Sequence, residues 1–81
     1  MPFVYILRCA DGTLYTGITK DVERRLAQHL AGRASRYTRA RLPVAVVWSR
    51  EVASWSAALR EEIRIKRLSR AAKEEMVRGS L

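Results

Sequence analysis

The order of apolar and polar positions predicts two short strands near the N-terminus. Residues 3–9, FVYILRC, are aromatic and β-branched, and residues 13–19, TLYTGIT, have the same character. The Asp11-Gly12 pair between them is a strong hairpin signal. We therefore predict an antiparallel hairpin at this end of the chain.

The length of the hairpin loop decides which side chains share a face of the ribbon. In a three-residue loop (10–12) with Gly12 in the left-handed conformation, Tyr5 pairs with Gly17. Because side chains alternate with a period of two, Tyr5 and Tyr15 then lie on one face. A loop one residue shorter would put the two tyrosines on opposite faces.

A helix is predicted after the hairpin, with an N-cap at Asp21 or Thr19 and an end at Gly32. Its apolar residues recur every four positions and should form the buried stripe: Val22, Leu26 and Leu30. Arg25 and His29 fall at the edge of that stripe rather than opposite it.

The rest of the chain predicts a loop, a strand and two helices. The segments are a basic loop at 33–42, a strand at 44–50, a long helix from Ser54 or Ser56 to about Leu68, and a short helix capped by Ser69 that ends near Gly79. The order β-β-α-β-α-α predicts an α+β protein with helices packed on a small sheet. We expect one domain over residues 1–81.

One acidic residue of the long helix falls on its apolar side. The residues that share the apolar arc are Trp55, Ala58, Leu59, Ile63 and Ile65. Glu62 lies inside this arc, and a carboxylate turned toward a core costs several kcal/mol unless it is compensated. Either Glu62 pairs with Lys66 or lies at the rim, or it is a metal ligand or catalytic carboxylate in a cleft.

The distribution of charge points to a class of partner. The formal net charge is +8, with 16 Lys and Arg against 8 Asp and Glu. No acid occurs between positions 24 and 50, which hold seven arginines: Arg24, Arg25, Arg33, Arg36, Arg39, Arg41 and Arg50. Such a block is typical of nucleic-acid binding, and the alternatives are an anionic membrane or an acidic protein. A loop rather than an amphipathic helix carries the block, which favours nucleic acid.

The cysteine content and the hydropathy exclude other classes. Cys9 is the only cysteine, so the chain has no internal disulfide and no cluster with zinc spacing. No apolar run has the length of a membrane span, and the N-terminus lacks the apolar region of a signal peptide. We expect a protein of the reducing cytoplasm.

These elements together resemble the GIY-YIG nuclease domain. Phe-Val-Tyr at 3–5 stands at the GIY place and Tyr-Thr-Gly at 15–17 at the YIG place. The helix residues that follow at the family's spacing are Arg25 and His29. The stretch ALREEIRIK places Glu62 where the family's metal-binding glutamate lies. The resemblance covers about residues 3–76 and is closest to the small stand-alone bacterial members.

The resemblance implies a three-stranded antiparallel sheet flanked by helices and a metal-dependent DNA endonuclease. By this analogy Glu62 holds a single Mg²⁺ or Mn²⁺ ion on the scissile phosphate. Arg25 pairs with the non-bridging oxygens. Tyr5 is the family's candidate general base, His29 is the rival base, and Tyr15 orients water or phosphate together with His29.

Further residues are expected to contact DNA. Gly17, opposite Tyr5, would leave the ribbon open so that substrate can approach. The loop arginines expected to contact phosphates are Arg33, Arg36, Arg39 and Arg41. Tyr37 is placed to stack on an unpaired base. We expect weak sequence preference and single-stranded or branched DNA, because no helix carries obvious base-reading residues.

The chain departs from the family pattern at three points. Phe3 replaces the glycine of the first triplet, and Thr16 replaces the isoleucine of the second. The asparagine that many members carry after the glutamate is absent, and Lys66 and Lys73 are candidates for part of its role. The alternative functions are a non-catalytic nucleic-acid-binding module with a basic groove and an adaptor that docks on an acidic protein.

Overall fold

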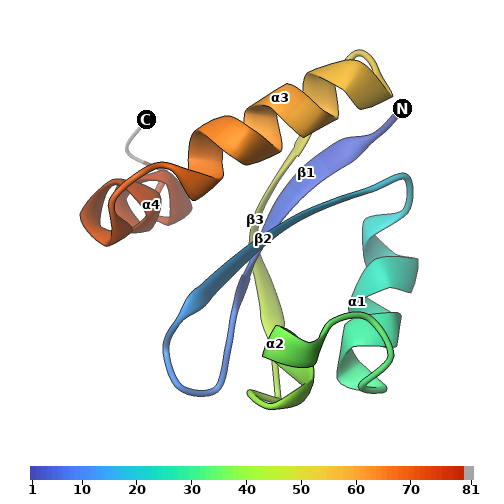
Figure 1. Cartoon of the computed structure of the whole chain (residues 1–81), viewed down its shortest axis with the longest axis vertical. Coiled ribbons are helices and arrows are strands. Elements are labelled where there is room, and N and C mark those ends of the chain that lie inside the picture. The colour runs from blue at the N-terminus through green and yellow to red at the C-terminus, as the bar shows by residue number, and fades with distance from the viewer. Residues whose placement is uncertain (80–81) are drawn as a thin grey trace.

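The computed structural model of the protein describes residues 1–79 and has a three-stranded sheet with the order β2-β1-β3 (Figure 1). Both strand pairs are antiparallel, which confirms the predicted α+β fold. The elements are β1 Phe3–Arg8, β2 Leu14–Thr19, α1 Val22–Leu30, α2 Arg36–Arg39, β3 Ala45–Glu51, α3 Trp55–Lys66 and α4 Arg70–Val77. No helix within residues 1–79 is long and apolar enough to cross a membrane.

The hairpin adopts the longer of the two loops considered. Tyr5 pairs with Gly17 across the β1–β2 ladder, and Leu7 pairs with Tyr15. The loop between the strands contains Gly12 at φ 85°, a left-handed conformation that suits glycine. Tyr5 and Tyr15 therefore lie on the same face of the sheet.

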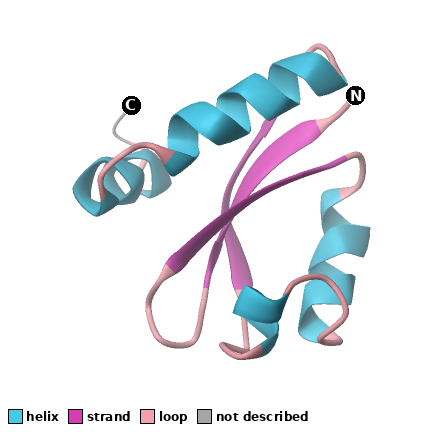
Figure 2. Ribbon diagram, in the orientation of Figure 1, coloured by secondary structure: helices cyan, strands magenta, loops and turns pink. Residues whose placement is uncertain are grey.

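Helices cover both faces of the sheet, with α3 and α4 on one side and α1 and α2 on the other (Figure 2). Strand β1 is central, so its alternate residues enter two different cores. Val4 and Ile6 pack in a cluster completed by Ala58, Ile65 and Met76. On the other face, the buried apolar residues are Tyr5, Leu7, Cys9 and Val44.

Side-chain oxygens cap the N-terminus of every helix within residues 1–79. The capping residues are Asp21, Ser35, Ser54 and Ser69. Three of these were candidates in the sequence. Ser35 was not, because residues 33–42 were expected to form a loop. That expectation is wrong for Arg36–Arg39, where the Ser35 hydroxyl accepts the Thr38 N–H at 3.2 Å and a one-turn helix forms.

The predicted apolar stripes of α1 and α3 are each only partly buried. Leu30 of α1 is 47% exposed, whereas His29 beside it is fully buried. On α3 only Ala58 and Ile65 of the predicted arc are buried, and the exposed members are Trp55, Leu59 and Ile63. In α1 the polar edge turns inward because His29 finds hydrogen-bond partners there.

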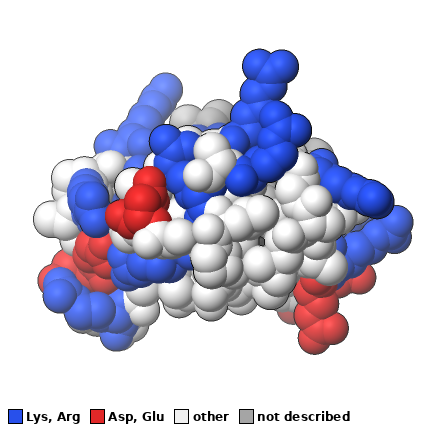
Figure 3. Space-filling view, turned by 90° about the horizontal axis from the view of Figure 1, so that it is seen from below, with Lys and Arg blue, Asp and Glu red and all other residues white. Residues whose placement is uncertain are grey.

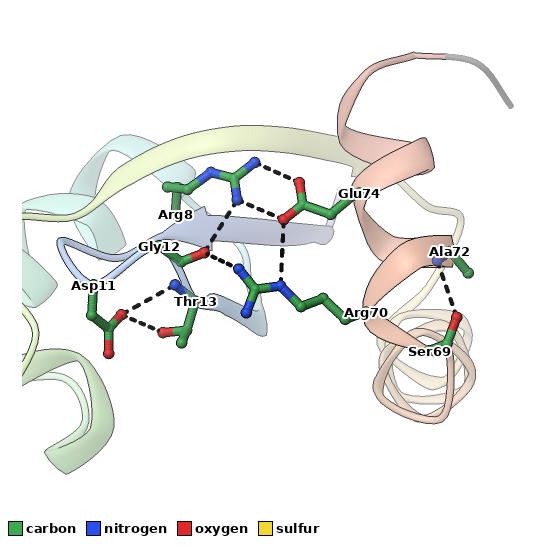
Figure 4. Close-up of polar contacts among 8 residues, drawn as sticks. All are labelled: Arg8, Asp11, Gly12, Thr13, Ser69, Arg70, Ala72 and Glu74. Atoms are coloured by element: carbon green, nitrogen blue, oxygen red, sulfur yellow. Dashed lines mark hydrogen bonds and ion pairs between the residues drawn. The ribbon is translucent and has the colours of Figure 1, made fainter.

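A polar cluster joins the hairpin loop to α4 (Figure 4). The Arg8 guanidinium makes two hydrogen bonds of 2.7 Å to the Glu74 carboxylate and holds the pKa of that carboxyl below its usual range. Arg8 and Arg70 both donate to the Gly12 carbonyl, at 3.2 and 3.1 Å. The paired guanidinium and carboxylate groups therefore fix the end of the hairpin against the last helix.

Candidate active site

Tyr5 lies at the centre of the α1/α2 face with its ring against Gly17. The residue is only 2% exposed. A Cβ atom at position 17 would lie 2.4 Å from the Tyr5 hydroxyl and 2.5 Å from Cζ, so only glycine leaves room for the ring. The sequence led us to expect open space for substrate over Gly17, and the structure fills that space with Tyr5.

A chain of buried hydrogen bonds starts at the Tyr5 hydroxyl. Tyr5 Oη lies 2.8 Å from Nε2 of His29, and Nδ1 of His29 lies 2.8 Å from Oγ1 of Thr38. The Thr38 hydroxyl in turn donates to the carbonyl of Ser35 at 3.3 Å. His29 and Thr38 are both fully buried. The chain of hydrogen bonds therefore links β1, α1 and α2 through buried side chains.

Sequence reasoning missed Thr38. Its hydroxyl is 2.8 Å from the ring of a candidate catalytic residue, yet it stands among exposed arginines in a segment read as a loop. The serine three residues before it, Ser35, was the available signal, because serine before a polar segment is a common N-cap. A helix at that position turns one side chain inward.

Tyr15, Tyr37 and Arg41 form a stacked group against the other side of His29. The Tyr15 ring meets the His29 ring edge-on at 5.4 Å and stacks on the Tyr37 ring at 5.9 Å. The Arg41 guanidinium lies 3.8 Å above the Tyr37 ring, and its Nε donates to Asp11 at 3.0 Å. Tyr37 and Arg41 thus have intramolecular partners as well as surface exposure.

Arg25 lies on α1 one turn before His29, as the sequence predicts, and lines a cleft of about 450 Å³. Other residues at the cleft include Lys20, Arg24, Gln28 and Trp55. Nη1 of Arg25 donates to Oε1 of Gln28 at 2.9 Å. Its Nε is buried without a hydrogen-bond partner among residues 1–79. An unsatisfied buried donor beside an open, basic cleft suits an incoming anion.

Glu62 projects from the side of α3 that carries Ala58 and Ile65, and its side chain is 19% exposed. Its Oε2 lies 3.4 Å from Nζ of Lys66, so the predicted ion pair exists. The Glu62 charge also acts on Tyr5, where it raises the pKa of the phenol.

The number of carboxylates at the site determines how a metal ion could be bound there. Residues 1–79 contain no group of three or more His, Cys, Asp or Glu side chains that could hold a metal by themselves. Mg²⁺ commonly binds through one or two carboxylates, with waters and substrate phosphates completing the shell. The single carboxylate of Glu62 is enough for this kind of binding. It is not enough for a site in which the protein supplies all the ligands.

Burial and Arg25 set the protonation of the Tyr5–His29 pair. Burial is the main cause that raises the pKa of Tyr5, and its interaction with Arg25 opposes this. Burial, followed by the Arg25 charge, lowers the pKa of His29. At neutral pH the phenol is therefore protonated and the imidazole is neutral.

The remaining predicted binding residues lie on the surface. Arg33, Arg36 and Arg39 are exposed around a shallow hollow that α2 and the segment before it form. Lys66 is exposed at the end of α3. In the view from below, Lys and Arg side chains cover more of the surface than Asp and Glu (Figure 3). In the basic block predicted from the sequence, Arg41 pairs with Asp11, and the exposed members are Arg24, Arg33, Arg36, Arg39 and Arg50.

A comparison with protein families identifies the family to which this chain belongs. The model of the GIY-YIG catalytic domain matches residues 1–75, and the chain belongs to this family. A UPF0213 protein of Natronomonas pharaonis is 55% identical over 93% of this chain and 88% of its own length. A UPF0213 protein of Halobacterium salinarum is 51% identical over 94% of this chain and 99% of its own. The resemblance to small members of the family is confirmed, and it extends to archaea.

Two solved structures share the fold. The solution structure of a UPF0213 protein from Bacillus halodurans superposes with a TM-score of 0.61 at 45% identity, covering 95% of this chain and 83% of that one. A protein from E. faecalis gives a TM-score of 0.63 at 34% identity, covering 95% and 82%. The family membership implies a nuclease fold and a nucleic-acid substrate.

Proposed function

We propose that the protein is a metal-dependent DNA endonuclease that hydrolyses phosphodiester bonds. The observation that carries this proposal is the 2.8 Å hydrogen bond between the Tyr5 hydroxyl and the buried imidazole of His29. A phenol beside a neutral base, a guanidinium and a carboxylate matches the needs of phosphoryl transfer, namely proton removal and charge stabilisation.

Tyr5 is proposed as the general base, and His29 acts through it. An attacking water gives its proton to Oη of Tyr5 while the Tyr5 proton passes to Nε2 of His29, 2.8 Å away. The hydroxide then bonds to phosphorus, and the opposite P–O bond breaks with its electron pair leaving on oxygen. We assign Tyr5, which is 2% exposed, rather than the fully buried His29, as the residue that meets the attacking water.

Arg25, Tyr15 and Glu62 are proposed to handle the phosphate. The unpartnered Nε of Arg25 would donate to a non-bridging oxygen. Tyr15, packed on His29, would orient water or phosphate from the same side. Glu62 would hold a single Mg²⁺ or Mn²⁺ ion, which when bound supplies Lewis acidity and stabilises the leaving oxygen. Lys66 beside it would contact the phosphate chain.

The surface around the cleft favours single-stranded or branched DNA with weak sequence specificity. Trp55 is 44% exposed at the cleft that Arg25 lines, which suits stacking on an unpaired base. Tyr37 stays a candidate contact, whereas the Tyr5 ring covers Gly17. The proposed phosphate contacts on the surface are Arg33, Arg36, Arg39 and Arg41. The buried free thiol of Cys9 is compatible with the reducing cytoplasm, where we place the protein.

Cleavage of labelled single-stranded, duplex and branched DNA with Mg²⁺ or Mn²⁺ tests the proposal. Glu62→Ala should abolish cutting, whereas the matched control Glu61→Ala, one residue away on the same helix, should retain it. Tight DNA binding without cutting by the wild type would instead favour the non-catalytic module. The absence of the family's asparagine would then be the first explanation to test. Absence of DNA binding in EDTA at moderate salt would favour the adaptor.

A further inference from the structure

We propose that Thr38 is a positioning residue that holds His29 in the Nδ1–H tautomer and so directs the lone pair of Nε2 at the Tyr5 hydroxyl. The catalytic consequence rests on the proposed function, whereas the tautomer is a property of the folded protein. Nothing in the family resemblance assigns a role to this threonine. The inference rests on the hydrogen bonds of three buried groups.

The direction of each hydrogen bond from Ser35 to Tyr5 follows from the number of protons that each group can donate. A threonine hydroxyl has one proton, and Thr38 directs it to the Ser35 carbonyl at 3.3 Å. This bond to the carbonyl three residues earlier is a common arrangement for threonine in a helix. In the proposed arrangement Oγ1 of Thr38 accepts from Nδ1 of His29 at 2.8 Å. A neutral imidazole with its proton on Nδ1 has a bare Nε2, which accepts from Tyr5.

Hydrogen bonds in the opposite direction would prevent proton transfer from Tyr5 to His29. If Thr38 donated to Nδ1, the imidazole proton would lie on Nε2 and point at the Tyr5 oxygen. His29 would then be unable to receive the phenol proton, because neither nitrogen would offer a free lone pair. The hydroxyl on α2 therefore decides whether the pair of Tyr5 and His29 can pass a proton at all.

The surroundings of Thr38 keep its hydroxyl in place. The N–H of Thr38 donates to the Ser35 hydroxyl that caps α2, so one residue fixes both the backbone and the side chain of the threonine. Thr38 is fully buried, although α2 is a single turn among exposed arginines. The short helix thus has a second role beside carrying basic residues, because it delivers one inward hydroxyl to His29.

A neutral partner also distinguishes this arrangement from a histidine held by a carboxylate. The hydrogen-bond and ring partners of His29 within residues 1–79 are Tyr5, Tyr15 and Thr38, all uncharged, and the Arg25 charge lowers the pKa of the imidazole after burial does. A carboxylate at Nδ1 would favour the imidazolium form. Threonine fixes the tautomer without supplying negative charge, so His29 stays free to accept a proton.

Nitrogen NMR reads the tautomer directly, because the chain has a single histidine and hence two ring nitrogens to observe. In the wild type at neutral pH we expect a protonated Nδ1 and an unprotonated Nε2. Thr38→Val should give a mixture of tautomers, and Thr38→Ser should restore the wild-type spectrum. The matched control is Thr16→Val, which removes another buried hydroxyl on the opposite face of the sheet.

The same variants then enter the cleavage assay. Thr38→Val should lower kcat about 10- to 100-fold, the usual cost of losing a group that orients a functional histidine. The DNA Kd should stay unchanged, and Thr38→Ser should recover most of the rate. A wild-type spectrum with the proton on Nε2, or a Thr38→Val variant with an unchanged tautomer, would overturn the inference. If the spectra are as expected but no variant, including the wild type, cleaves DNA, the proposed tautomer is supported and the proposed nuclease function is rejected.

Discussion

The two faces of the sheet are built from alternate residues of one strand, yet they bury different chemistry. Toward α3 and α4, Val4 and Ile6 enter a hydrophobic cluster. Toward α1 and α2, the neighbouring residue Tyr5 begins a chain of hydrogen bonds through His29 and Thr38. The first face is held by close packing, and the second by packing together with a directional polar network.

This difference separates stability from the proposed chemistry. Burial of apolar side chains supplies most of the free energy of folding in a small domain. A buried hydrogen bond adds only about 1 kcal/mol net, although an orphaned partner costs more. We therefore expect substitutions of the buried apolar residues on the α3/α4 face to change mainly unfolding, and substitutions in the hydrogen-bond network on the α1/α2 face to change mainly cleavage.

Closing the space over Gly17 should produce the largest effect. Gly17→Ala places a methyl group where the Tyr5 ring lies, so the ring must move and its bond to His29 must break. We expect the cleavage rate to fall by about 100-fold or more, the usual contribution of a positioned acid or base.

A double-mutant cycle checks this cause. The cost of Gly17→Ala in unfolding free energy should shrink in a Tyr5→Ala background, because the clash is absent there. Equal costs in the two backgrounds would mean that the ring does not restrict position 17.

Shortening a buried side chain on the α3/α4 face should lower stability rather than the cleavage rate. Ile6→Ala removes a fully buried side chain and should lower the unfolding free energy by about 2–5 kcal/mol. Denaturant titration measures this cost, and molecules that remain folded should cleave DNA at the wild-type rate. A folded Ile6→Ala variant with a rate as low as that of Gly17→Ala would erase the distinction between the faces.

Lowering the pH should reduce the unfolding free energy over a defined range, through His29 on the α1/α2 face. The pKa of His29 is lowered by burial and by Arg25, so the unfolded chain binds the proton more tightly than the folded protein. Stability therefore rises with pH between the lowered pKa and about 6.5, by up to about 1.4 kcal/mol per pH unit, and is lost as pH falls through that window.

His29→Gln isolates this contribution. Unfolding free energies measured in denaturant across pH 5–8 should lose this slope in the variant, whereas Thr16→Val should keep it. The same pH dependence in His29→Gln and in the wild type would assign the slope to other groups.

The surface arginines should have a smaller effect, confined to binding. Replacing Arg33, Arg36 and Arg39 with alanine should weaken DNA binding and reduce the salt slope by about 0.7 for each lost contact with a single strand. The control removes equal charge from α3 and its C-cap: Arg60, Arg64 and Arg67. Equal slopes in the two triple variants would show that net charge alone matters, and that α2 does not contact phosphate.

Local rules in the sequence predict much of the frame around the site. The loop ending at Gly12 sets the hairpin register, and the register places Tyr5 against Gly17. The capping residues Asp21, Ser54 and Ser69 were each candidates before the structure. Turns and caps are predictable because they depend on a few neighbouring residues.

The packing of the helices could not be predicted in the same way. Helical periodicity assigns Leu30 to the interior and His29 to its edge, but docking of α1 buries His29 and exposes Leu30. The inward turn of Thr38 depends likewise on a contact nine residues away in the chain. For Glu62 the sequence left an ion pair and a metal or catalytic role in a cleft as alternatives; the ion pair with Lys66 is present, and the second role stays a proposal.

The rate of DNA cleavage by Tyr5→Phe tests the proposed division between the faces most directly. This substitution removes one hydroxyl, keeps the ring against Gly17, and is compared with Ile6→Val on the neighbouring residue of the opposite face. With Mg²⁺ and the DNA form that the wild type cuts best, we expect a loss of at least about 100-fold for Tyr5→Phe and none for Ile6→Val, with DNA affinity unchanged in both. Wild-type cleavage by a folded Tyr5→Phe variant would contradict the assignment of Tyr5 as the base.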